Sequence, residues 1–415
     1  MKTNGVEVFD VAGGMKLAVE PIEAAANATI VWTVPVGSAG DPIGDLGSGE
    51  SNVLSEVILR GAGDRSSREF SDALDLLGVQ RATSSSPYVI TISATCLVAE
   101  TIKTMELLRD LVLHPTIDQE SLDASRELAL QSLGSLTDDP QHYASIKIAE
   151  ISLPSPFGGH GYGTEAGLNA LTTESLRATW NRRCRPGGSI MGVAGGIQPS
   201  MIRELMERLL EGWTGTSIEP IVSAPPRIGS LHEKQPSAQS HVCLSLPAPK
   251  ESDAASLPTK FVVRVLGGGG MSNRLFSEVR EKRGLCYSVG MSYACGRDRG
   301  LMTVYAGSTP ERAAETLDCI RRELARMVRG VTAEEFSRAV IGIKSGVVMA
   351  GESTMARASA IAGDLFRLGR VRTLAEIVAS IDRMTIAQVN DQAADALAPE
   401  RIADAALVVV GPAPL

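Results

Sequence analysis

The residues best able to do chemistry in this sequence are Arg280 and Tyr287, which lie close together in the stretch Leu266–Tyr293. A guanidinium offers several N–H donors in a fixed fork, and a phenol offers a hydroxyl on a rigid ring. Both groups can donate hydrogen bonds to the carbonyl oxygens of an extended peptide or to an oxyanion. On residue types alone, a solvated cation at a helix end and a half-buried strand aromatic are the more ordinary interpretation.

The same stretch indicates which elements must position these two side chains. Gly267–Gly270 allow positive φ angles and a close backbone approach, so we expect a tight turn. A helix should follow, with an apolar stripe formed by Met271, Leu275, Phe276 and Val279. Gly284 is suited to the end of that helix, and one face of the next strand should carry Tyr287, Val289, Met291 and Tyr293. A phosphate-binding loop is disfavoured, because no Gly-Lys-Ser/Thr follows the glycines.

This stretch resembles the signature of the C-terminal half in the insulinase/pitrilysin (M16) family, particularly in bacterial and mitochondrial processing peptidases. The family pattern is a Gly-rich turn, then Ser-x-Arg/Leu-Leu-Phe, then Leu-Arg-Glu-Lys-Arg-Gly-Leu-x-Tyr-Ser-Val. Here the pattern stands at Gly269–Phe276 and Val279–Val289. The resemblance implies that Arg280 and Tyr287 hold the substrate backbone near a zinc ion.

The first half of the chain departs from the family at the metal site. Members of the family carry an inverted zinc motif, His-x-x-Glu-His, in which two imidazoles bind the metal and the glutamate activates a water. Aligned on Gly61, the matching positions are Asn52, Ser55 and Glu56, and the third ligand would fall near Gln131–Ser132. No two histidines of the chain have the spacing of this motif, and Glu56 is typical of an ordinary exposed helical residue. The resemblance therefore implies a degenerate motif, with no catalytic residue, metal or other cofactor in this chain.

A second departure concerns the strand that binds substrate in the family, which normally carries Asn-Ala-x-Thr. The matching stretch here is Arg81–Ser84, and Pro87 follows soon after it. Because proline lacks a backbone N–H donor, we expect the pairing of a peptide with this edge to be shortened. This departure agrees with a first half that has lost the catalytic role.

Periodicity predicts an α+β fold made of two duplicated domains, each a mostly antiparallel sheet packed with helices, as in the insulinase family. Strands are predicted at 6–9, 16–20, 29–36, 79–84, 89–95 and 190–195. Helices are predicted at 51–60, 67–77, 98–113, 119–136 and 175–183. The Pro-, Ser- and Gly-containing stretch 216–239 is typical of a linker. It separates an N-terminal domain, 1–215, from a C-terminal domain, 240–415.

Two echoes in the sequence suggest the duplication. Thr172 and Thr385 each precede a helix, a proline and an apolar strand, and the spacing from threonine to proline is the same. In the second echo, Gly49–Leu54 is similar to Gly270–Leu275. Repeats this far apart indicate duplicated domains rather than a solenoid.

Composition limits the classes of partner and the location. A formal net charge of −8 argues against nucleic acid or an anionic membrane as the main partner. No apolar run is long enough to span a membrane. The stretch Met1–Glu7 has no apolar core of a signal peptide, so we expect a cytoplasmic protein, with the periplasm left open. The scattered cysteines are typical of reduced, mostly buried thiols.

The resemblance implies a zinc-less subunit of a heterodimeric processing peptidase, which would be inactive alone. The partner would be a homologous M16 chain that carries His-x-x-Glu-His and holds the zinc. This chain would contribute the substrate-binding residues Arg280 and Tyr287, and the substrate would be a peptide or an unfolded polypeptide.

Other interpretations stay open at this point. In a structural or scaffold subunit without proteolytic role, Arg280 and Tyr287 would only be inherited residues. A homodimer would bury the same surfaces as a heterodimer. A regulatory subunit of the mitochondrial type is disfavoured, because the glycines run directly into Met271 without the longer loop of that subunit. A self-sufficient peptidase would need ligands that the sequence lacks.

Overall fold

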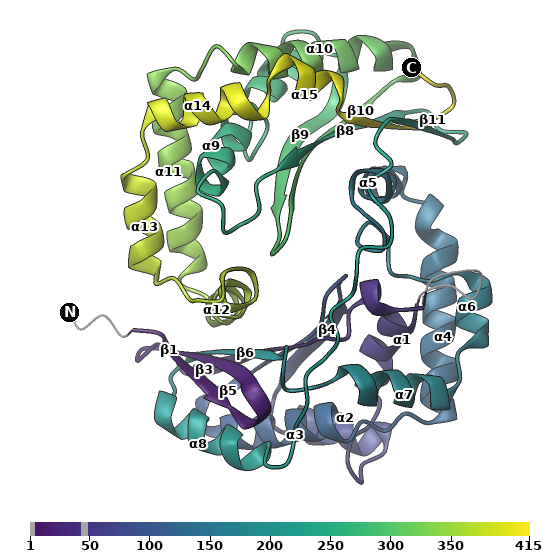
Figure 1. Cartoon of the computed structure of the whole chain (residues 1–415), viewed down its shortest axis with the longest axis vertical. Helices are drawn as coiled ribbons and strands as arrows, with labels where there is room; N and C mark the ends of the chain where they lie inside the picture. Colours follow the sequence, from purple (N-terminus) through teal and green to yellow (C-terminus); the bar gives the residue numbers. More distant parts are fainter. Residues whose placement is uncertain (1–4, 43–48) are drawn as a thin grey trace. The chain divides into compact units, whose positions relative to one another are not determined.

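The computed structural model describes residues 5–42 and 49–415, which form two compact units (Figure 1). Each unit combines segments that are far apart in the sequence. Unit 1 consists of the described residues of Met1–Ser135, Gly159–Ser223 and Ala350–Thr373. Unit 2 consists of Leu136–Gly158, Ala224–Met349 and Leu374–Leu415. The compact units therefore do not follow a single cut in the sequence.

A six-stranded sheet lies at the centre of unit 1. In the order in which they pair, its strands are β1 (Glu7–Val11), β2 (Met15–Pro21), β6 (Ile190–Gly195), β3 (Asn27–Val34), β5 (Ile90–Leu97) and β4 (Gln80–Ser85). The pair β2 and β6 is parallel, and the other neighbours are antiparallel. Strands β3 and β6 are buried along nearly their whole length, which explains why their sequences are apolar rather than alternating.

Unit 2 contains a five-stranded sheet. In pairing order its strands are β7 (Ser230–Lys234), β11 (Ala406–Gly411), β8 (Ser240–Ala248), β10 (Gly300–Ser308) and β9 (Cys286–Cys295). The predicted linker 216–239 extends too far toward its C-terminal end, because strand β7 lies within that range. This strand pairs in parallel with β11 at the sheet border, and its short sequence, SLHEK, has no apolar run that would reveal it.

The two sheets share one topology, which confirms the predicted α+β fold with duplicated domains. In chain order, β2 to β6 correspond to β7 to β11, and corresponding strands have the same neighbours and directions. The helices α7 (Thr173–Arg183) and α14 (Ile386–Ala396) correspond as well. Each begins with a capping box, at Thr172 and at Thr385 respectively, as the first echo suggests.

The second echo, between Gly49–Leu54 and Gly270–Leu275, does not mark equivalent positions in the two units. Helix α1 (Glu50–Val57) is the first helix after β3, and it packs against β4 and α7. Its counterpart after β8 is α9 (Ser256–Leu266), which packs against β9 and α14. The helical segment after Gly270 comes second and corresponds to α2 (Ser67–Leu76). The similar letters reflect the Gly, Ser and Asn residues that helix starts favour in general.

Helices cover both faces of the unit 1 sheet. On one face, Ile30 and Trp32 of β3 join a core with α1, α2, α3 (Thr101–Leu113), α7 and α8 (Pro199–Leu209). On the other face, Val31 packs with Ala358 and Ile361 of α12 (Thr354–Leu368). Helix α4 (Gln119–Gly134) packs against α1, and α6 (Glu165–Ala170) packs against α4. This alternation along β3 is the period-2 pattern of a strand buried on both sides.

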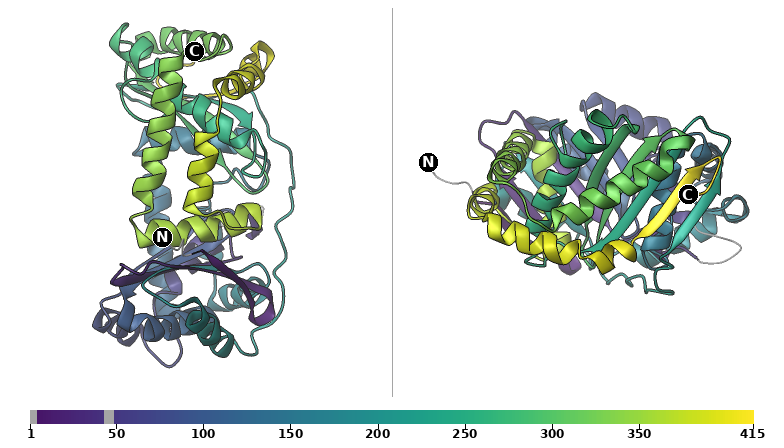
Figure 2. Two further views of the ribbon diagram at one scale, coloured as in Figure 1. Left: turned by 90° about the vertical axis from the view of Figure 1, so that its left-hand side faces the viewer. Right: turned by 90° about the horizontal axis from the view of Figure 1, so that it is seen from above.

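The unit 2 sheet is covered in the same way, with helices layered over its strands (Figure 2). Val242 and Leu244 of β8 face a core shared with α9, α10 (Ala313–Met327) and α14, whereas Cys243 faces α5 (Pro140–Ser152). The remaining helices of this unit are α11 (Ala333–Ala350), α13 (Leu374–Asp382) and α15 (Pro399–Ala403).

The two halves of the sequence exchange one helix each. Helix α5 follows α4 in the first half but packs on the β8–β11 sheet of unit 2. Helix α12 follows α11 in the second half but packs on the sheet of unit 1, where Arg357 forms an ion pair with Glu20 at 2.8 Å. The exchange explains why both compact units are discontinuous in sequence.

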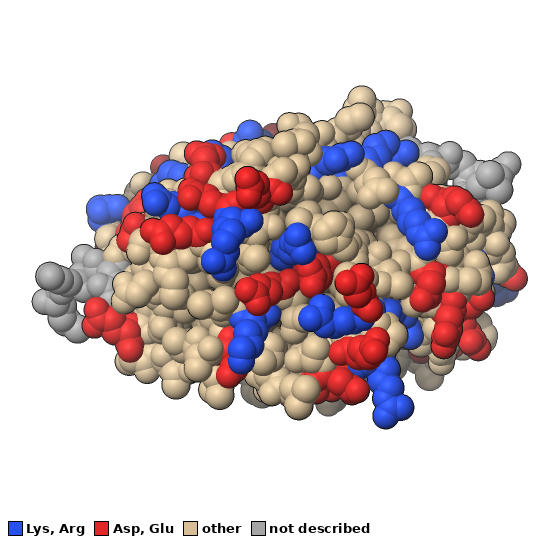
Figure 3. All heavy atoms as spheres, turned by 90° about the horizontal axis from the view of Figure 1, so that it is seen from below, with Lys and Arg blue, Asp and Glu red and all other residues tan. Residues whose placement is uncertain are grey.

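One face of the molecule carries both positive and negative side chains (Figure 3). On the face shown in Figure 3, Lys and Arg side chains alternate with Asp and Glu side chains, so that face has no continuous basic field. Among the described residues, no helix combines the length and the apolar character that crossing a bilayer would require.

Candidate functional site

The predicted turn and helix around Arg280 are present, but the helix is wider than an α-helix. Asn273 caps it: its side-chain oxygen accepts a hydrogen bond from the N–H of Phe276 (2.8 Å), and its amide donates to the carbonyl of Gly270 (2.8 Å). The segment η5 (Phe276–Glu281) is a π-helix, and the N–H of Lys282 reaches back to the carbonyl of Ser277 at 3.0 Å. Such turns are rare and are frequent at functional sites.

Met271 does not belong to the predicted apolar stripe of this helix. Its side chain is 72% exposed, whereas Leu275 and Val279 are fully buried. The residue precedes the Asn273 cap and therefore belongs to the Gly-rich turn, whose backbone does not follow the helical period. The predicted C-terminal glycine is confirmed, because Gly284 has a φ of +61°, in the left-handed region that glycine adopts most easily.

Tyr287 projects from the sheet because of a β-bulge in the edge strand β9. Gly307 of β10 faces Ser288, and Ser308 faces Cys286, so Tyr287 is the extra residue between the two pairs. A bulge re-aims a side chain, and bulges are common next to active sites. Tyr287 is 77% exposed, and it does not share a face with the predicted set Val289, Met291 and Tyr293, which packs toward the core.

Arg280 lies between two aromatic rings. Its guanidinium carbon is 4.8 Å from the centroid of the Phe276 ring and 4.9 Å from the centroid of the Tyr287 ring. Within residues 5–42 and 49–415, no hydrogen bond or ion pair engages this guanidinium. Stacking on two rings fixes the plane of the group and leaves its N–H donors available to a ligand.

The neighbouring basic residues are arranged differently. Lys282 and Arg283 both bind the carboxylate of Glu278, at 2.6 Å and 2.7 Å. The hydrogen bonds from Lys282 and from Arg283 lower the pKa of Glu278. Of the three cations in this cluster, Arg280 is therefore the one whose charge no carboxylate of the described residues neutralises.

Arg274 anchors the same helix to α11. Its guanidinium donates to both carboxylate oxygens of Glu335, at 2.7 Å and 2.8 Å, and to the carbonyl of Gly330 at 2.9 Å. Burial alone would raise the pKa of Glu335, but the hydrogen bonds from Arg274 and Thr332 outweigh it and lower the pKa to about 2. Arg274 thus holds the helix that positions Arg280.

The Glu335 carboxylate should make unit 2 sensitive to acid. Because its pKa is lower in the folded chain than the ordinary value of 4.5, the ionised group stabilises the fold above that value. This stabilisation should be lost progressively as the pH falls from 4.5 toward 2. In Arg274→Met, denaturant unfolding across this range should show a shallower loss than in the native chain. An equally steep loss would contradict the assignment.

The degenerate metal positions lie together on α1 in unit 1. Ser55 is buried, and its hydroxyl donates to the carbonyl of Asn52 at 2.7 Å, while Glu56 is exposed. Gln131 and Ser132 are exposed on α4, which packs against α1. No group of three or more His, Cys, Asp or Glu side chains in the described ranges is placed to hold a metal ion. Of these side chains only Glu56 offers a group that zinc binds, and one carboxylate does not fit a zinc site, which takes three or four imidazole, thiolate or carboxylate ligands.

A buried ion pair holds the start of α1. Asp41 and Arg183 are 4% and 5% exposed, and their charged groups are 3.0 Å apart. The second oxygen of Asp41 accepts hydrogen bonds from the backbone N–H of Gly49 (3.2 Å) and Ser51 (3.0 Å). Sequence reasoning missed this pair, because its members are 142 residues apart and neither belongs to a motif.

Glu50 is buried next to this pair and accepts a hydrogen bond from the Thr179 hydroxyl at 2.8 Å. Burial raises the pKa of Glu50, and the Thr179 hydrogen bond acts in the opposite direction. The start of α1 is thus held by a network of buried polar groups that bind one another.

The predicted substrate strand of the first half is the edge strand β4. Its Arg81 is bound to α2, through Asp75 (2.7 Å) and Ser71 (2.6 Å). The Thr83 hydroxyl donates to the carbonyl of Ser55 at 2.7 Å. Pro87 lies in the turn between β4 and β5 and not in either strand, so its missing N–H does not interrupt the edge.

The chain thus contains two sets of predicted site residues, one in each unit. Arg280 and Tyr287 come together in unit 2, and Phe276, which the sequence suggested as a core residue, joins them. Asn52, Ser55 and Glu56 share one helix in unit 1. A π-helix and a bulge carry no motif in the sequence, so the sequence could not indicate this stacking.

Comparison with protein families gives two matches along the chain. Residues 16–152 match the family described as Insulinase (Peptidase family M16). Residues 170–343 match the family described as Peptidase M16 inactive domain. The second match contains the segment with Arg280 and Tyr287.

Similar proteins are found among bacteria. The chain is 26% identical to an uncharacterized zinc protease of Mycobacterium leprae, over 94% of this chain and 88% of the relative. It is 27% identical to an uncharacterized zinc protease of Streptomyces coelicolor, over 96% of this chain and 88% of the relative.

Solved structures show the same fold. A peptidase M16 inactive domain from Pseudomonas fluorescens superposes with a TM-score of 0.88 at 20% identity, covering 99% of this chain and 98% of that one. A protease from Helicobacter pylori gives a TM-score of 0.88 at 16% identity, covering 98% of this chain and 99% of that one.

Proposed function

The chain belongs to the insulinase family of M16 peptidases, and from this premise we propose that it is the substrate-gripping, zinc-less subunit of a peptidase complex. A homologous partner chain with the His-x-x-Glu-His motif would hold the metal. One observation carries the proposal: Arg280 is ordered between two rings without a carboxylate partner in the described part of the chain, beside an exposed phenol. The M16 inactive-domain match supports a non-catalytic peptidase-like role.

Arg280 would donate to a substrate carbonyl oxygen, and it would stabilise the negative charge that develops on that oxygen during peptide hydrolysis. The guanidinium is planar by its own resonance, and the rings of Phe276 and Tyr287 restrict its orientation, so little rotamer entropy is lost when substrate binds. The Tyr287 hydroxyl would add a second donor. Together these residues would bind and orient the scissile peptide, and a zinc ion held by the partner would supply the activated water.

Unit 1 supports the need for a partner. Its helix α1 presents Asn52, Ser55 and Glu56 where the family holds its metal, and these side chains lack the necessary imidazoles. The assembly would therefore be a heterodimer, with zinc expected in the partner and peptides or unfolded polypeptides as substrates.

Photocrosslinking tests this assignment. Tyr287 would be replaced by photoreactive benzoylphenylalanine in the chain co-expressed with its candidate partner, and a labelled peptide substrate would be added. We expect the peptide to be crosslinked at position 287, because the 77% exposed side chain would contact bound substrate. A scaffold role predicts no such product.

The matched control is Leu76 on α2, which is 86% exposed and belongs to no candidate site. The same photoreactive residue at this position should not capture the peptide above background. Equal capture at both positions, or none at position 287 while the complex binds peptide, would refute the proposed role of Tyr287.

A further inference from the structure

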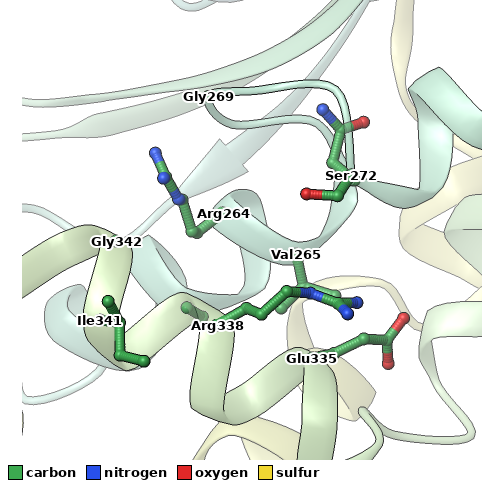
Figure 4. A pocket seen from close by; sticks show the side chains of 10 residues that line it. Arg264, Val265, Gly269, Ser272, Glu335, Arg338, Ile341 and Gly342 are labelled. Carbon is green, nitrogen blue, oxygen red and sulfur yellow. The ribbon is translucent and has the colours of Figure 1, made fainter.

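We propose that a pocket of unit 2 binds a carboxylate of the polypeptide substrate, through the guanidinium of Arg264. The pocket has a volume of about 250 Å³ and lies between α9, the Gly-rich turn and the first half of α11 (Figure 4). Its lining includes Arg264, Gly269, Ser272, Arg338, Ile341 and Gly342. The identification of the ligand as a polypeptide rests on the proposed function. Its identification as an anion rests on the residues of the pocket alone.

Two glycines leave the space that the Arg264 side chain occupies. A Cβ atom added to Gly269 would lie 2.1 Å from one guanidinium nitrogen, and a Cβ atom added to Gly342 would lie 2.4 Å from the other. Arg264 therefore passes between the turn and α11 at a point where neither residue can carry a side chain. Packing, and not an ion pair, fixes the direction of this cation.

No carboxylate among the described residues neutralises the positive charge of Arg264. Glu335 on the pocket wall is already bound by Arg274 through both oxygens, and Arg338 is bound by Glu334. In the described ranges, no hydrogen bond or ion pair engages Arg264. A positively charged fork at a pocket, without its own carboxylate, fits a carboxylate or a phosphate from outside.

Further donors belong to the Gly-rich turn, of which Gly269 and Ser272 line the pocket. The backbone N–H groups of Gly269, Gly270 and Met271 donate no hydrogen bond within the part of the chain that the structure describes. The same holds for the N–H and the hydroxyl of Ser272, whose side chain projects toward the pocket in Figure 4. These neutral donors could bind the second oxygen of an anion that Arg264 attracts.

The rim of the pocket favours a peptide over free phosphate. Ile341, which lines the pocket from α11, is 63% exposed, and Met271, the neighbour in sequence of the lining residue Ser272, is 72% exposed. Exposed apolar side chains beside a cation suit a ligand that joins an anionic end to apolar side chains, as the C-terminal residues of a polypeptide do. A phosphate ion would leave these side chains in water.

Calorimetry on the isolated chain tests the proposal without zinc or partner. One short unstructured peptide with an apolar C-terminal residue would be titrated as the free acid and as the C-terminal amide, and inorganic phosphate would be titrated alone. We expect the free acid to bind roughly ten-fold or more tightly than the amide, because a charge-assisted hydrogen bond is lost in the amide.

Two variants locate the binding. Arg264→Met keeps an unbranched apolar stem but removes the guanidinium, so it should weaken binding of the free acid roughly ten- to a hundred-fold. Gly342→Ala favours the α11 helix but displaces the guanidinium, so it should also weaken binding while circular dichroism shows an intact fold and unfolding shows no loss of stability. Arg322→Gln, at an exposed arginine of α10, is the matched charge control and should bind normally.

The outcomes separate this proposal from the proposed function. Equal binding of acid and amide, unchanged binding by Arg264→Met, or tight binding of phosphate with none of the peptide would each overturn it. If the assembled native complex does not cleave peptides although the isolated chain still binds the free acid more tightly than the amide, the result would count against the proposed function alone.

Discussion

Replacing Arg280 with alanine should lower the kcat/KM of the assembled peptidase roughly ten- to a hundred-fold, because a hydrogen bond from a charged donor to the reacting carbonyl is lost. The loss should appear mainly in kcat if the bond strengthens in the transition state. Folding should hardly change, because the guanidinium makes ring contacts and no described ion pair. Steady-state cleavage of a fluorogenic peptide by the co-purified complex measures the effect.

Arg283→Ala is the matched control for this prediction. It removes a cation from the turn that follows the same helix, but one that is already bound to Glu278 at 2.7 Å and 38% exposed. We therefore expect kcat/KM to change by much less than for Arg280→Ala. If both variants lose activity equally, the effect reflects the charge of the segment, and the specific role of Arg280 is wrong.

Replacing Arg183 with methionine should destabilise unit 1 by about 3–5 kcal/mol, the typical cost of leaving one member of a buried ion pair uncompensated. Asp41 is 4% exposed and would keep its hydrogen bonds to the start of α1 while losing its counter-charge. Denaturant unfolding followed by tryptophan fluorescence reports this unit alone, since the three tryptophans, Trp32, Trp180 and Trp213, all belong to it.

Asp72→Ala provides the comparison. It removes an ion pair with Arg68 on α2 in which the two side chains are 65% and 92% exposed. Exposed pairs contribute little to stability, so the unfolding midpoint should hardly move. A similarly small shift in Arg183→Met would show that the Asp41–Arg183 pair does not hold the start of α1.

The pattern of apolar residues was sufficient for much of the fold. The strands and helices predicted in the first half all occur, with ends displaced by a few residues, because strand alternation and helical spacing are local properties. The linker was only partly predictable. Its last residues form β7, which pairs with β11 at the other end of the chain, and such a long-range pairing leaves no local trace.

The exchange of α5 and α12 could not be predicted for a related reason. Sequence shows that a helix has an apolar face, but not which of two similar sheets will cover that face. The apolar residues of α5, such as Ile148 and Ile151, would suit either sheet, and the connections decide the outcome. A single domain boundary placed at the proline-rich linker therefore does not reproduce compact units that are discontinuous in sequence.

The site residues were identifiable by family resemblance, but their geometry was not. Arg280 and Tyr287 stand in a recognisable motif, whereas the π-helix and the bulge that bring them onto each other are departures from regular structure. The sequence carries one signal for Arg264: an arginine inside the apolar run FVVRVL, which directly precedes four glycines. A charged residue in such a run needs room, and Gly269 and Gly342 supply it.

The most direct test of the central claim is a cleavage assay of the chain alone and of the chain co-expressed with a candidate partner bearing His-x-x-Glu-His, with and without a chelator. We expect the complex to cleave peptide, the chelator to abolish cleavage, and the isolated chain to contain no stoichiometric zinc and to be inactive. One tightly bound zinc per isolated chain together with cleavage, or a complex with zinc in the partner that never cleaves peptides, would contradict the account.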